Sequence, residues 1–144
     1  MKILIDTNVL VRAVERAHPL LRVARDALRH LYSQNHELFI TPQNVSEFWN
    51  VCTCPVNANG LGNSIEETSR LTSRLENFFA ILPETMETFH QWRKLVVVHA
   101  VTGAKVHHAR LAAIIVAYGL DAILTFNADD FSRFSILVLD PRGV

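Results

Sequence analysis

The chain has 144 residues, of which 49% are hydrophobic, which is enough for one domain with a substantial core. Its 14 Lys and Arg residues balance 14 Asp and Glu residues, so the formal net charge is zero. This balance excludes a polybasic nucleic-acid binder but not a local patch of either sign. Because hydrophobicity is high and net charge is low, a largely disordered chain is also excluded. We therefore predict a single domain over residues 1–144.

The predicted elements alternate between short apolar strands and helices. In chain order, we expect strands at 2–5, 38–40, 80–82, 122–125 and 136–139. Helical spacing and helix-start signals predict helices at about 9–17, 20–34, 41–52, 64–79, 84–101 and 105–118. The Gly- and Asn-rich segment 55–63 is expected to be a surface loop. This alternation predicts an α/β fold with three layers, α/β/α, around a parallel sheet of four to five short strands.

Several features of the sequence favour a cytoplasmic protein with no membrane contact. The first apolar stretch stops at Asp6, which is not the pattern of a secretory signal. The longest apolar run, 111–119, is too short to cross a bilayer, which needs about 20 residues. Cys52 and Cys54 are separated by a single residue, which leaves little room for an unstrained disulfide, so we expect both thiols to be reduced.

Polar side chains follow the strands at their carboxyl ends, where open parallel sheets place their ligand sites. Asp6 directly follows the first strand, and Glu47 lies near the start of the helix after the second. His108 is expected on the inward face of the helix before the fourth strand, and Asn127 and Asp130 follow that strand. Each has a purely structural alternative: a helix cap for Asp6, an exposed helix acid for Glu47, a capping or core role for His108, and turn formation for the last two.

A shared rim for these groups would predict a metal site. Converging carboxylates repel one another and raise each other's pKa unless a cation lies between them. Carboxylate and amide oxygens suit a hard cation such as Mg²⁺ or Mn²⁺. A water bound to such a cation is a suitable nucleophile for phosphodiester cleavage.

Two groups of arginines have helical spacing. Arg12 and Arg16 are one turn apart, and Arg22, Arg25 and Arg29 share one face of the next predicted helix. A solvated helix face would account for them, and so would contacts to phosphate oxygens.

The candidate residues lie in motifs that resemble PIN-domain ribonucleases of the VapC type, the toxins of bacterial toxin–antitoxin modules. The similarity covers nearly the whole chain, through Ile5–Leu10, Val45–Val51, Val106–Leu111, Leu124–Asn127 and Asp130–Phe131. It implies a PIN-like fold and a metal-dependent endoribonuclease with Mg²⁺ or Mn²⁺ as cofactor. It also implies an RNA substrate, a cognate antitoxin as partner and a homodimer.

The family's acidic site carries over position by position, with one departure. Asp6 and Glu47 match the first two acids, and Asn127 and Asp130 match the region of the fourth. At the position of the third acid this chain has His108. The resemblance implies that Asp6, Glu47, His108 and Asp130 are catalytic and that these four, with Asn127, bind the metal.

Three further residues complete the expected site, and His108 leaves two hypotheses open. Asn8 and Thr125 are expected to support the metal ligands, and Arg110 to contact the substrate. Imidazole favours Mn²⁺ or Zn²⁺ over Mg²⁺, so His108 could still bind metal with an altered preference. Alternatively, the chain is a catalytically impaired binding module that retains affinity for RNA or antitoxin.

A third class, a phosphatase or receiver domain, also places acids at strand ends. Both would need a lysine after a later strand, and the phosphatase motif would need a second Asp where Asn8 stands. The only lysines, Lys2, Lys94 and Lys105, are not at such a position. We therefore favour the nuclease interpretation.

Overall fold

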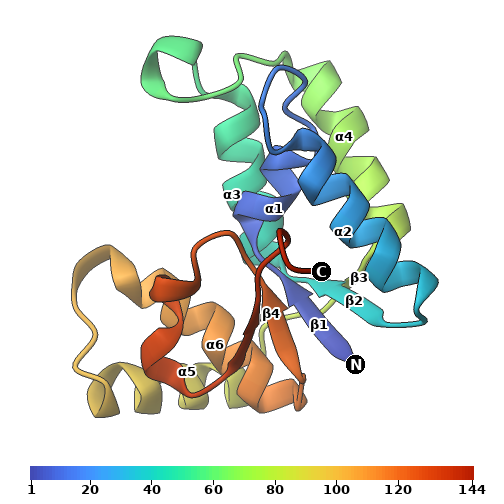
Figure 1. Ribbon diagram of the computed structural model, residues 1–144. Helices are drawn as coiled ribbons and strands as arrows, with labels where there is room; N and C mark the ends of the chain where they lie inside the picture. Colours follow the sequence, from blue (N-terminus) through green and yellow to red (C-terminus); the bar gives the residue numbers. More distant parts are fainter.

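The computed structural model describes all residues, 1–144, and has an α/β fold. Its sheet contains five strands in the order β3-β2-β1-β4-β5, and every neighbouring pair is parallel (Figure 1). This confirms the predicted fold class. The strands are β1 (Lys2–Ile5), β2 (Glu37–Ile40), β3 (Ala80–Ile81), β4 (Ala122–Leu124) and β5 (Leu137–Leu139).

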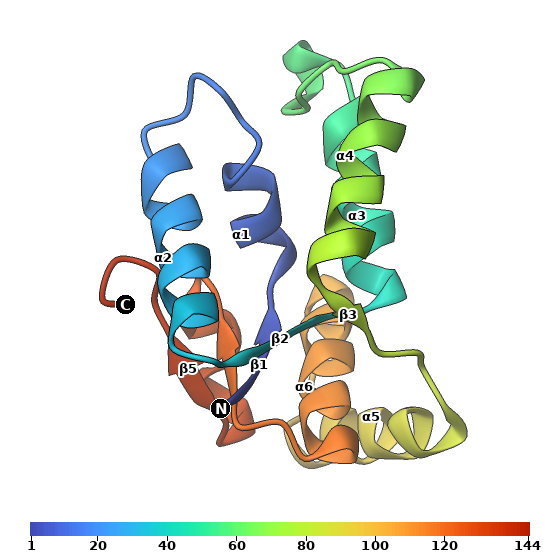
Figure 2. The same cartoon turned by 90° about the vertical axis from the view of Figure 1, so that its right-hand side faces the viewer.

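Helices connect the strands and cover both faces of the sheet. They are α1 (Thr7–Arg12), α2 (Leu21–Ser33), α3 (Pro42–Thr53), α4 (Ile65–Phe78), α5 (Met86–Val98) and α6 (Val106–Tyr118). Figure 2 shows α3 and α4 side by side, with α5 and α6 grouped at the opposite end of the view. None of these helices is long and apolar enough to cross a membrane.

The three layers follow from the alternation of side chains along the strands. Ile3 and Ile5 of β1 point to one face, where they pack with buried residues of α1, α2, α3 and α4. Leu4 points to the other face, where it packs with buried residues of α6 and with α5. Burying each of these side chains fully contributes about 1.5–3 kcal/mol. The sheet is therefore packed between two helical layers, which hold its carboxyl edge in place relative to both layers.

The first helix is shorter than the predicted span 9–17. It begins at Thr7 and ends at Arg12. The carbonyl oxygen of Ala13 accepts a 2.8 Å hydrogen bond from Nε of Arg25, a side chain of α2, and no helical N–H takes it. The segment after Arg12 forms turns instead, and these turns carry Glu15 and Arg16 to the surface between α1 and α2. The predicted end of the helix at residue 17 is therefore wrong, and local spacing does not reveal the contact between Arg25 and Ala13.

The segment 55–63 is a loop, as predicted, and it is anchored to the end of α3. The N–H groups of Leu61 and Asn63 donate to the carbonyls of Val51 and Cys52, at 2.9 and 2.8 Å. At Gly60 a Cβ atom would lie 1.9 Å from the carbonyl oxygen of Cys54, so only glycine fits there. The close contact holds the loop in one place.

The two cysteines are free, as predicted. Cys52 is buried in the core beneath α3, and this burial raises the pKa of its thiol to about 11. A thiol with such a pKa is protonated at neutral pH and is a weak nucleophile. Cys52 therefore serves the packing of the core.

Candidate functional site

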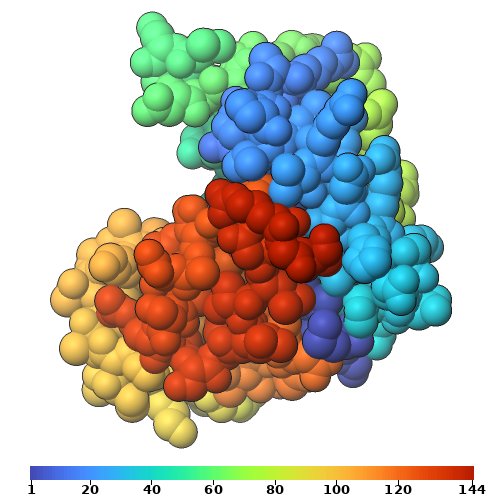
Figure 3. Space-filling model, in the orientation of Figure 1, coloured from blue at the N-terminus to red at the C-terminus, as the bar shows by residue number.

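A cavity of about 450 Å³ lies at the carboxyl ends of β1 and β4. In the space-filling view, the loop 55–63 projects above the rest of the chain and leaves a recess beneath it (Figure 3). The lining of the cavity includes all five residues expected to bind metal, although they come from separate parts of the chain. These are Asp6, Glu47, His108, Asn127 and Asp130.

Asp6 lies between β1 and α1 and is held by two side chains. Its Oδ2 atom accepts hydrogen bonds from Thr125 Oγ1 at 2.7 Å and from Asn8 Nδ2 at 2.9 Å. Asp6 occupies the N-cap position of α1, yet its side chain makes no capping hydrogen bond. The carboxylate therefore points into the cavity region and does not serve as the helix cap.

The pKa of Asp6 is raised above its ordinary value, chiefly because the carboxyl group is buried. The hydrogen bond from Thr125, the charge of His108 and the N–H of Thr7 act in the opposite direction, and the charge of Glu47 raises the pKa further. A buried acid beside another acid is the arrangement in which a cation would be most strongly stabilised.

Thr125 and Asn8 link β4 to the Asp6 carboxylate through hydrogen bonds. The Thr125 hydroxyl is buried and accepts hydrogen bonds from Asn8 Nδ2 and from the N–H of Asn127, each at 3.0 Å. Asn8 Oδ1 accepts from the N–H of Phe126 at 3.2 Å. These contacts fix the segment after β4 against the start of α1.

Glu47 lies in α3, and both of its carboxylate oxygens accept hydrogen bonds. Thr7 Oγ1 donates to Oε2 and Gln43 Nε2 donates to Oε1, each at 2.7 Å. Gln43 also donates to the carbonyl of His107 at 3.0 Å, which links α3 to the start of α6. Thr7 and Gln43 contact the candidate site, and sequence reasoning missed both. Their signals were weak: Thr7 follows Asp6 directly, and Gln43 precedes Glu47 by one helical turn.

The start of α3 supports this arrangement. Thr41 and Asn44 form a capping box, in which each side chain accepts a hydrogen bond from the other residue's backbone N–H. The amide of Asn44 then donates to Thr7 Oγ1 at 3.1 Å. A chain of hydrogen bonds therefore runs from the helix cap through Thr7 to Glu47. The predicted helix start at Thr41 and Pro42 is confirmed, and it also positions the acid.

His108 faces the cavity from the first turn of α6. Its Nε2 lies 3.6 Å from Oδ2 of Asp130, and its Nδ1 is buried without a hydrogen-bond partner. The ring also packs against Phe131, with 5.5 Å between ring centroids. Leu111 and Ala112, one turn further along α6, are buried in the core, which confirms the predicted inward face.

Several residues absent from the predicted site also line the cavity. Arg12 and Glu15 form an ion pair at its edge, and Asn59 reaches it from the loop 55–63. The signal for Arg12 was its position one helical turn after Asn8, which places both on one face of α1. Glu15 and Asn59 arrive through turns and a loop, for which the sequence offered no comparable signal.

Arg110 does not line this cavity. Its guanidinium pairs with Glu84 at 2.7 Å in a separate cavity of about 550 Å³ between α5 and α6. The separation arises because residues two positions apart on a helix point in different directions, so Arg110 and His108 diverge. Arg110 is therefore not positioned to contact a substrate bound in the Asp6 cavity.

The cavity suits a divalent cation in the type of its donors. Carboxylate, amide and imidazole groups line it, and Nδ1 of His108 is buried and unpartnered. However, no three His, Cys, Asp or Glu side chains are close enough together to hold one ion. Glu47 is engaged by Thr7 and Gln43, and His108 lies beside Asp130. This arrangement fits Mg²⁺, which uses one or two carboxylates and keeps several waters, better than a closed cage of protein ligands.

The fold and this cavity define a known class of protein. The PIN domain family model matches residues 3–137, and the chain belongs to the PIN domain family. No protein of curated function matches the chain.

Solved structures of similar fold extend over nearly the full length of the chain. One is a chain of VapBC-1 from nontypeable Haemophilus influenzae, with a TM-score of 0.74, 15% identity and 98% of each chain covered. A chain of VapBC2 from Rickettsia felis, bound to a promoter DNA fragment, gives a TM-score of 0.73 and 14% identity, covering 97% of this chain and 98% of that one. VapC20 of Mycobacterium tuberculosis, a Sarcin-Ricin loop cleaving toxin, gives 0.68 and 14%, with 94% and 97% covered. At such identities the similarity shows the fold.

Proposed function

We propose that this chain is a metal-dependent endoribonuclease and the toxin of a toxin–antitoxin module. The observation that carries the proposal is the convergence of Asp6, Glu47, His108 and Asp130 in one cavity at the carboxyl edge of the sheet. These side chains come from four separate segments, and the fold brings them together. Membership of the PIN domain family and the similarity of fold to a Sarcin-Ricin loop cleaving toxin support the choice of RNA as substrate.

The residues of the cavity have distinct roles in this proposal. Asp6, Glu47 and Asp130 would hold Mg²⁺ or Mn²⁺, one or two of them directly and the rest through bound water, with His108 and Asn127 as neighbouring donors. When bound, the cation supplies a water of lowered pKa and stabilises charge on the phosphate. The protein contributes by orienting the carboxylates of Asp6 and Glu47, each of which accepts two side-chain hydrogen bonds.

Thr125 and Thr7 are positioning residues in this scheme. The Thr125 hydroxyl lowers the pKa of Asp6 and so opposes the effect of burial. Thr7 orients Glu47 through a 2.7 Å hydrogen bond. The hydrogen bond that Thr125 donates favours the ionised form of Asp6, which a cation requires.

His108 is expected to change the metal preference without abolishing cleavage. Its imidazole must be neutral to bind metal, and it brings no negative charge. The site therefore has one negative charge fewer than the family pattern, and Mn²⁺ should support cleavage better than Mg²⁺.

A protein antitoxin and a second copy of the chain complete the proposed assembly. Solved structures of similar fold include complexes described as VapBC, two of them with DNA bound. Their similarity supports an antitoxin partner for this chain. The homodimer rests on the family resemblance.

Cleavage of a mixed pool of single-stranded RNA tests the function. The chain is incubated with RNA in EDTA, Mg²⁺ and Mn²⁺, beside Glu47→Gln and the matched control Glu76→Gln. Glu76 is an exposed acid on α4 that makes no hydrogen bond or ion pair. We expect metal-dependent cleavage by the chain and by Glu76→Gln, and none by Glu47→Gln. Cleavage that persists in Glu47→Gln would come from a contaminant or another site, and would contradict the proposal.

The alternative function is a binding module that holds RNA or antitoxin without efficient cleavage. The observation that favours it is His108 at the position of the third acid. The same assay separates the two: Glu47-dependent turnover excludes the alternative, whereas RNA binding with no turnover in any metal supports it.

A further inference from the structure

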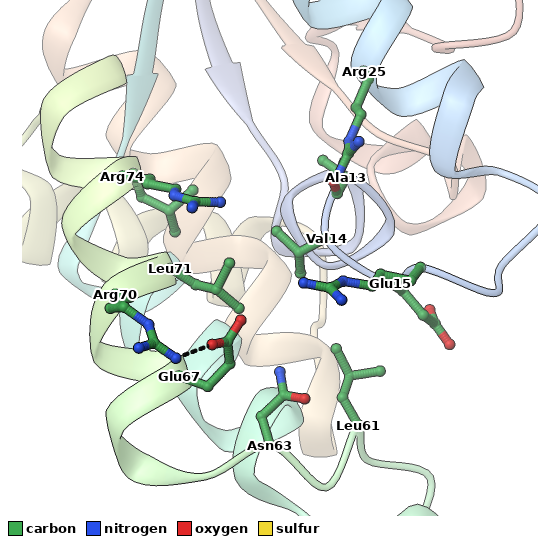
Figure 4. Close-up of a pocket in the computed structure, with 12 residues that line it drawn as sticks. Ala13, Val14, Glu15, Arg25, Leu61, Asn63, Glu67, Arg70, Leu71 and Arg74 are labelled. Atoms are coloured by element: carbon green, nitrogen blue, oxygen red, sulfur yellow. Dashed lines mark hydrogen bonds and ion pairs between the residues drawn. The ribbon is translucent and has the colours of Figure 1, made fainter.

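A second cavity, of about 820 Å³, lies next to the first and is rich in arginine. It is enclosed by the turns after α1, by α2 and by α4 (Figure 4). Arg70 and Arg74 project from α4, and Arg25 of α2 lies across from them. We call this surface the arginine groove, and define it by its four guanidinium groups: Arg16, Arg25, Arg70 and Arg74.

The arginine groove carries positive charge in excess. Two acids also line it, Glu15 and Glu67, so four cationic groups face two anionic ones. Glu15 is already paired with Arg12, which lies outside the groove. The hydrogen bond and charge of Arg70, with smaller effects of Arg16 and Arg74, hold the pKa of Glu67 below its ordinary value. Glu67 is therefore ionised at neutral pH, and the groove keeps two positive charges in excess.

Two of the guanidinium groups have no partner within the chain. Arg70 pairs with Glu67, and Arg25 donates to the carbonyl of Ala13. Arg16 and Arg74 make no hydrogen bond and no ion pair, although both line the groove. Unpaired guanidinium groups in a concave surface are well suited to oxygens of an anionic ligand, because their planar forks bind phosphate with two parallel hydrogen bonds.

The groove adjoins the candidate active site. Glu15 and Leu61 line both cavities, so they share a wall. Leu61 is fixed there by its backbone hydrogen bond to Val51. A phosphodiester placed among the acids of the first cavity has nucleotides on both sides, and these must leave over the adjoining surface. The arginine groove is an adjoining surface with the opposite charge to a phosphate backbone.

We propose that the arginine groove binds the phosphate backbone of the single-stranded RNA that enters the candidate active site. This inference rests on the proposed function, since it assigns the path of that substrate. It also explains how a chain of zero net charge can bind RNA: the positive charge is concentrated beside the acidic cavity. Contacts of this kind set affinity and register and read no base sequence.

The test is binding of a fluorescein-labelled single-stranded RNA of about 12 nucleotides, within the range of site sizes of single-strand binders. Anisotropy is measured in the Glu47→Gln background, so that the RNA stays intact, over a series of salt concentrations. The variant Arg16→Gln/Arg74→Gln removes the two unpaired guanidinium groups and keeps most of each aliphatic stem. The control Arg22→Gln/Arg93→Gln removes two exposed, unpaired arginines that lie outside the groove.

We expect the groove variant to bind RNA about tenfold more weakly, and the slope of log K against log salt to fall by about 1.4, or about 0.7 per lost phosphate contact. The control should keep both values. Equal losses in the two variants, or none in either, would overturn the inference, as would a background protein that binds no RNA. Weaker binding of an oligoglutamate peptide with unchanged RNA binding would also overturn it, because the groove would then accept an acidic protein segment.

The proposed function is judged separately, by Glu47-dependent cleavage in the chain with all arginines present. If cleavage occurs and RNA binding is insensitive to Arg16 and Arg74, the function stands and the assignment of the groove fails. If no metal supports cleavage, the proposed function fails whatever the binding data show.

Discussion

The Nε2 atom of His108 lies 3.6 Å from Oδ2 of Asp130, while Nδ1 of the same ring is buried without a partner. The contact joins the start of α6 to the segment after β4. An imidazole tolerates this closeness to a carboxylate, whereas two carboxylates in these places would repel one another unless a cation lay between them. Residue 108 thus determines how strongly the site depends on a bound cation.

The first prediction concerns His108→Asp. The variant should be destabilised in EDTA, because Asp130 then faces a second acid, and it should regain stability when Mg²⁺ is added. Ligand at 100 times its dissociation constant stabilises a protein by about 2.7 kcal/mol. Melting temperature with and without Mg²⁺ measures the effect, and the ratio of cleavage rates in Mg²⁺ and Mn²⁺ should rise about tenfold or more.

The matched control is His107→Asp. His107 is exposed, and its replacement by Asp adds the same charge one residue away from position 108. It should show neither the Mg²⁺-dependent stabilisation nor the altered metal ratio. An identical Mg²⁺ dependence in the original chain and in His108→Asp would show that residue 108 does not influence the cation.

The second prediction uses the raised pKa of Asp6. Because burial raises this pKa, the folded chain holds the proton more tightly than the unfolded chain does. The contribution of Asp6 to stability is therefore greatest below the ordinary pKa of an aspartate, and it is lost as pH rises through the higher, folded value. At neutral pH the ionised, buried carboxylate destabilises the metal-free chain.

Asp6→Asn removes that penalty and keeps an oxygen to accept from Thr125. In EDTA at pH 7 its melting temperature should be higher than that of the original chain, and the difference should shrink toward pH 3. Cleavage should be lost. Asp129→Asn, a change at an exposed acid, serves as control and should show no such trend. A lower melting temperature for Asp6→Asn at pH 7 would contradict the prediction.

The third prediction concerns the buried hydroxyl of Thr125, which donates to Asp6 and accepts from Asn8 and Asn127. Thr125→Val keeps the shape of the side chain but leaves these groups without their partner. We expect a loss of about 1–3 kcal/mol of stability and a fall in cleavage of about 10–100-fold. The pKa of Asp6 should rise further, so the acid limb of the pH–rate profile moves to higher pH.

Thr125→Ser is the rescue variant, since it restores the hydroxyl without the methyl group. A purely steric role for Thr125 would leave the pH profile of Thr125→Val unchanged. The profile therefore separates positioning of Asp6 from simple packing.

The fourth prediction tests the loop 55–63. In Gly60→Ala the new methyl group would meet the carbonyl oxygen of Cys54 at 1.9 Å, so backbone must move. Such overpacking costs about 1–3 kcal/mol, measurable as a lower midpoint of urea unfolding. Gly143→Ala is the control, because its nearest neighbour would be an ordinary 3.8 Å contact with Asp140. Equal midpoints for the two variants would show that the loop accommodates the added methyl group without loss of stability, and would contradict the prediction.

Much of the candidate site was predictable because parallel strands bring their carboxyl ends to one edge. Asp6 directly follows β1, and Asp130 lies in the segment after β4, which is paired with β1. Glu47 and His108 were predicted from helical spacing, which placed them near the same edge. These inferences needed only local patterns and the general rule for open sheets.

Periodicity and order along the chain were enough to predict the α/β fold, its strands and the set of polar residues at the sheet edge. Tertiary structure alone decided where α1 ends, because Arg25 takes the carbonyl of Ala13. The tertiary structure also places Arg110 beside Glu84, and brings Arg16 and Arg74 to the same groove. Long flexible side chains find their partners in space, and their spacing along the chain does not specify which partner is within reach.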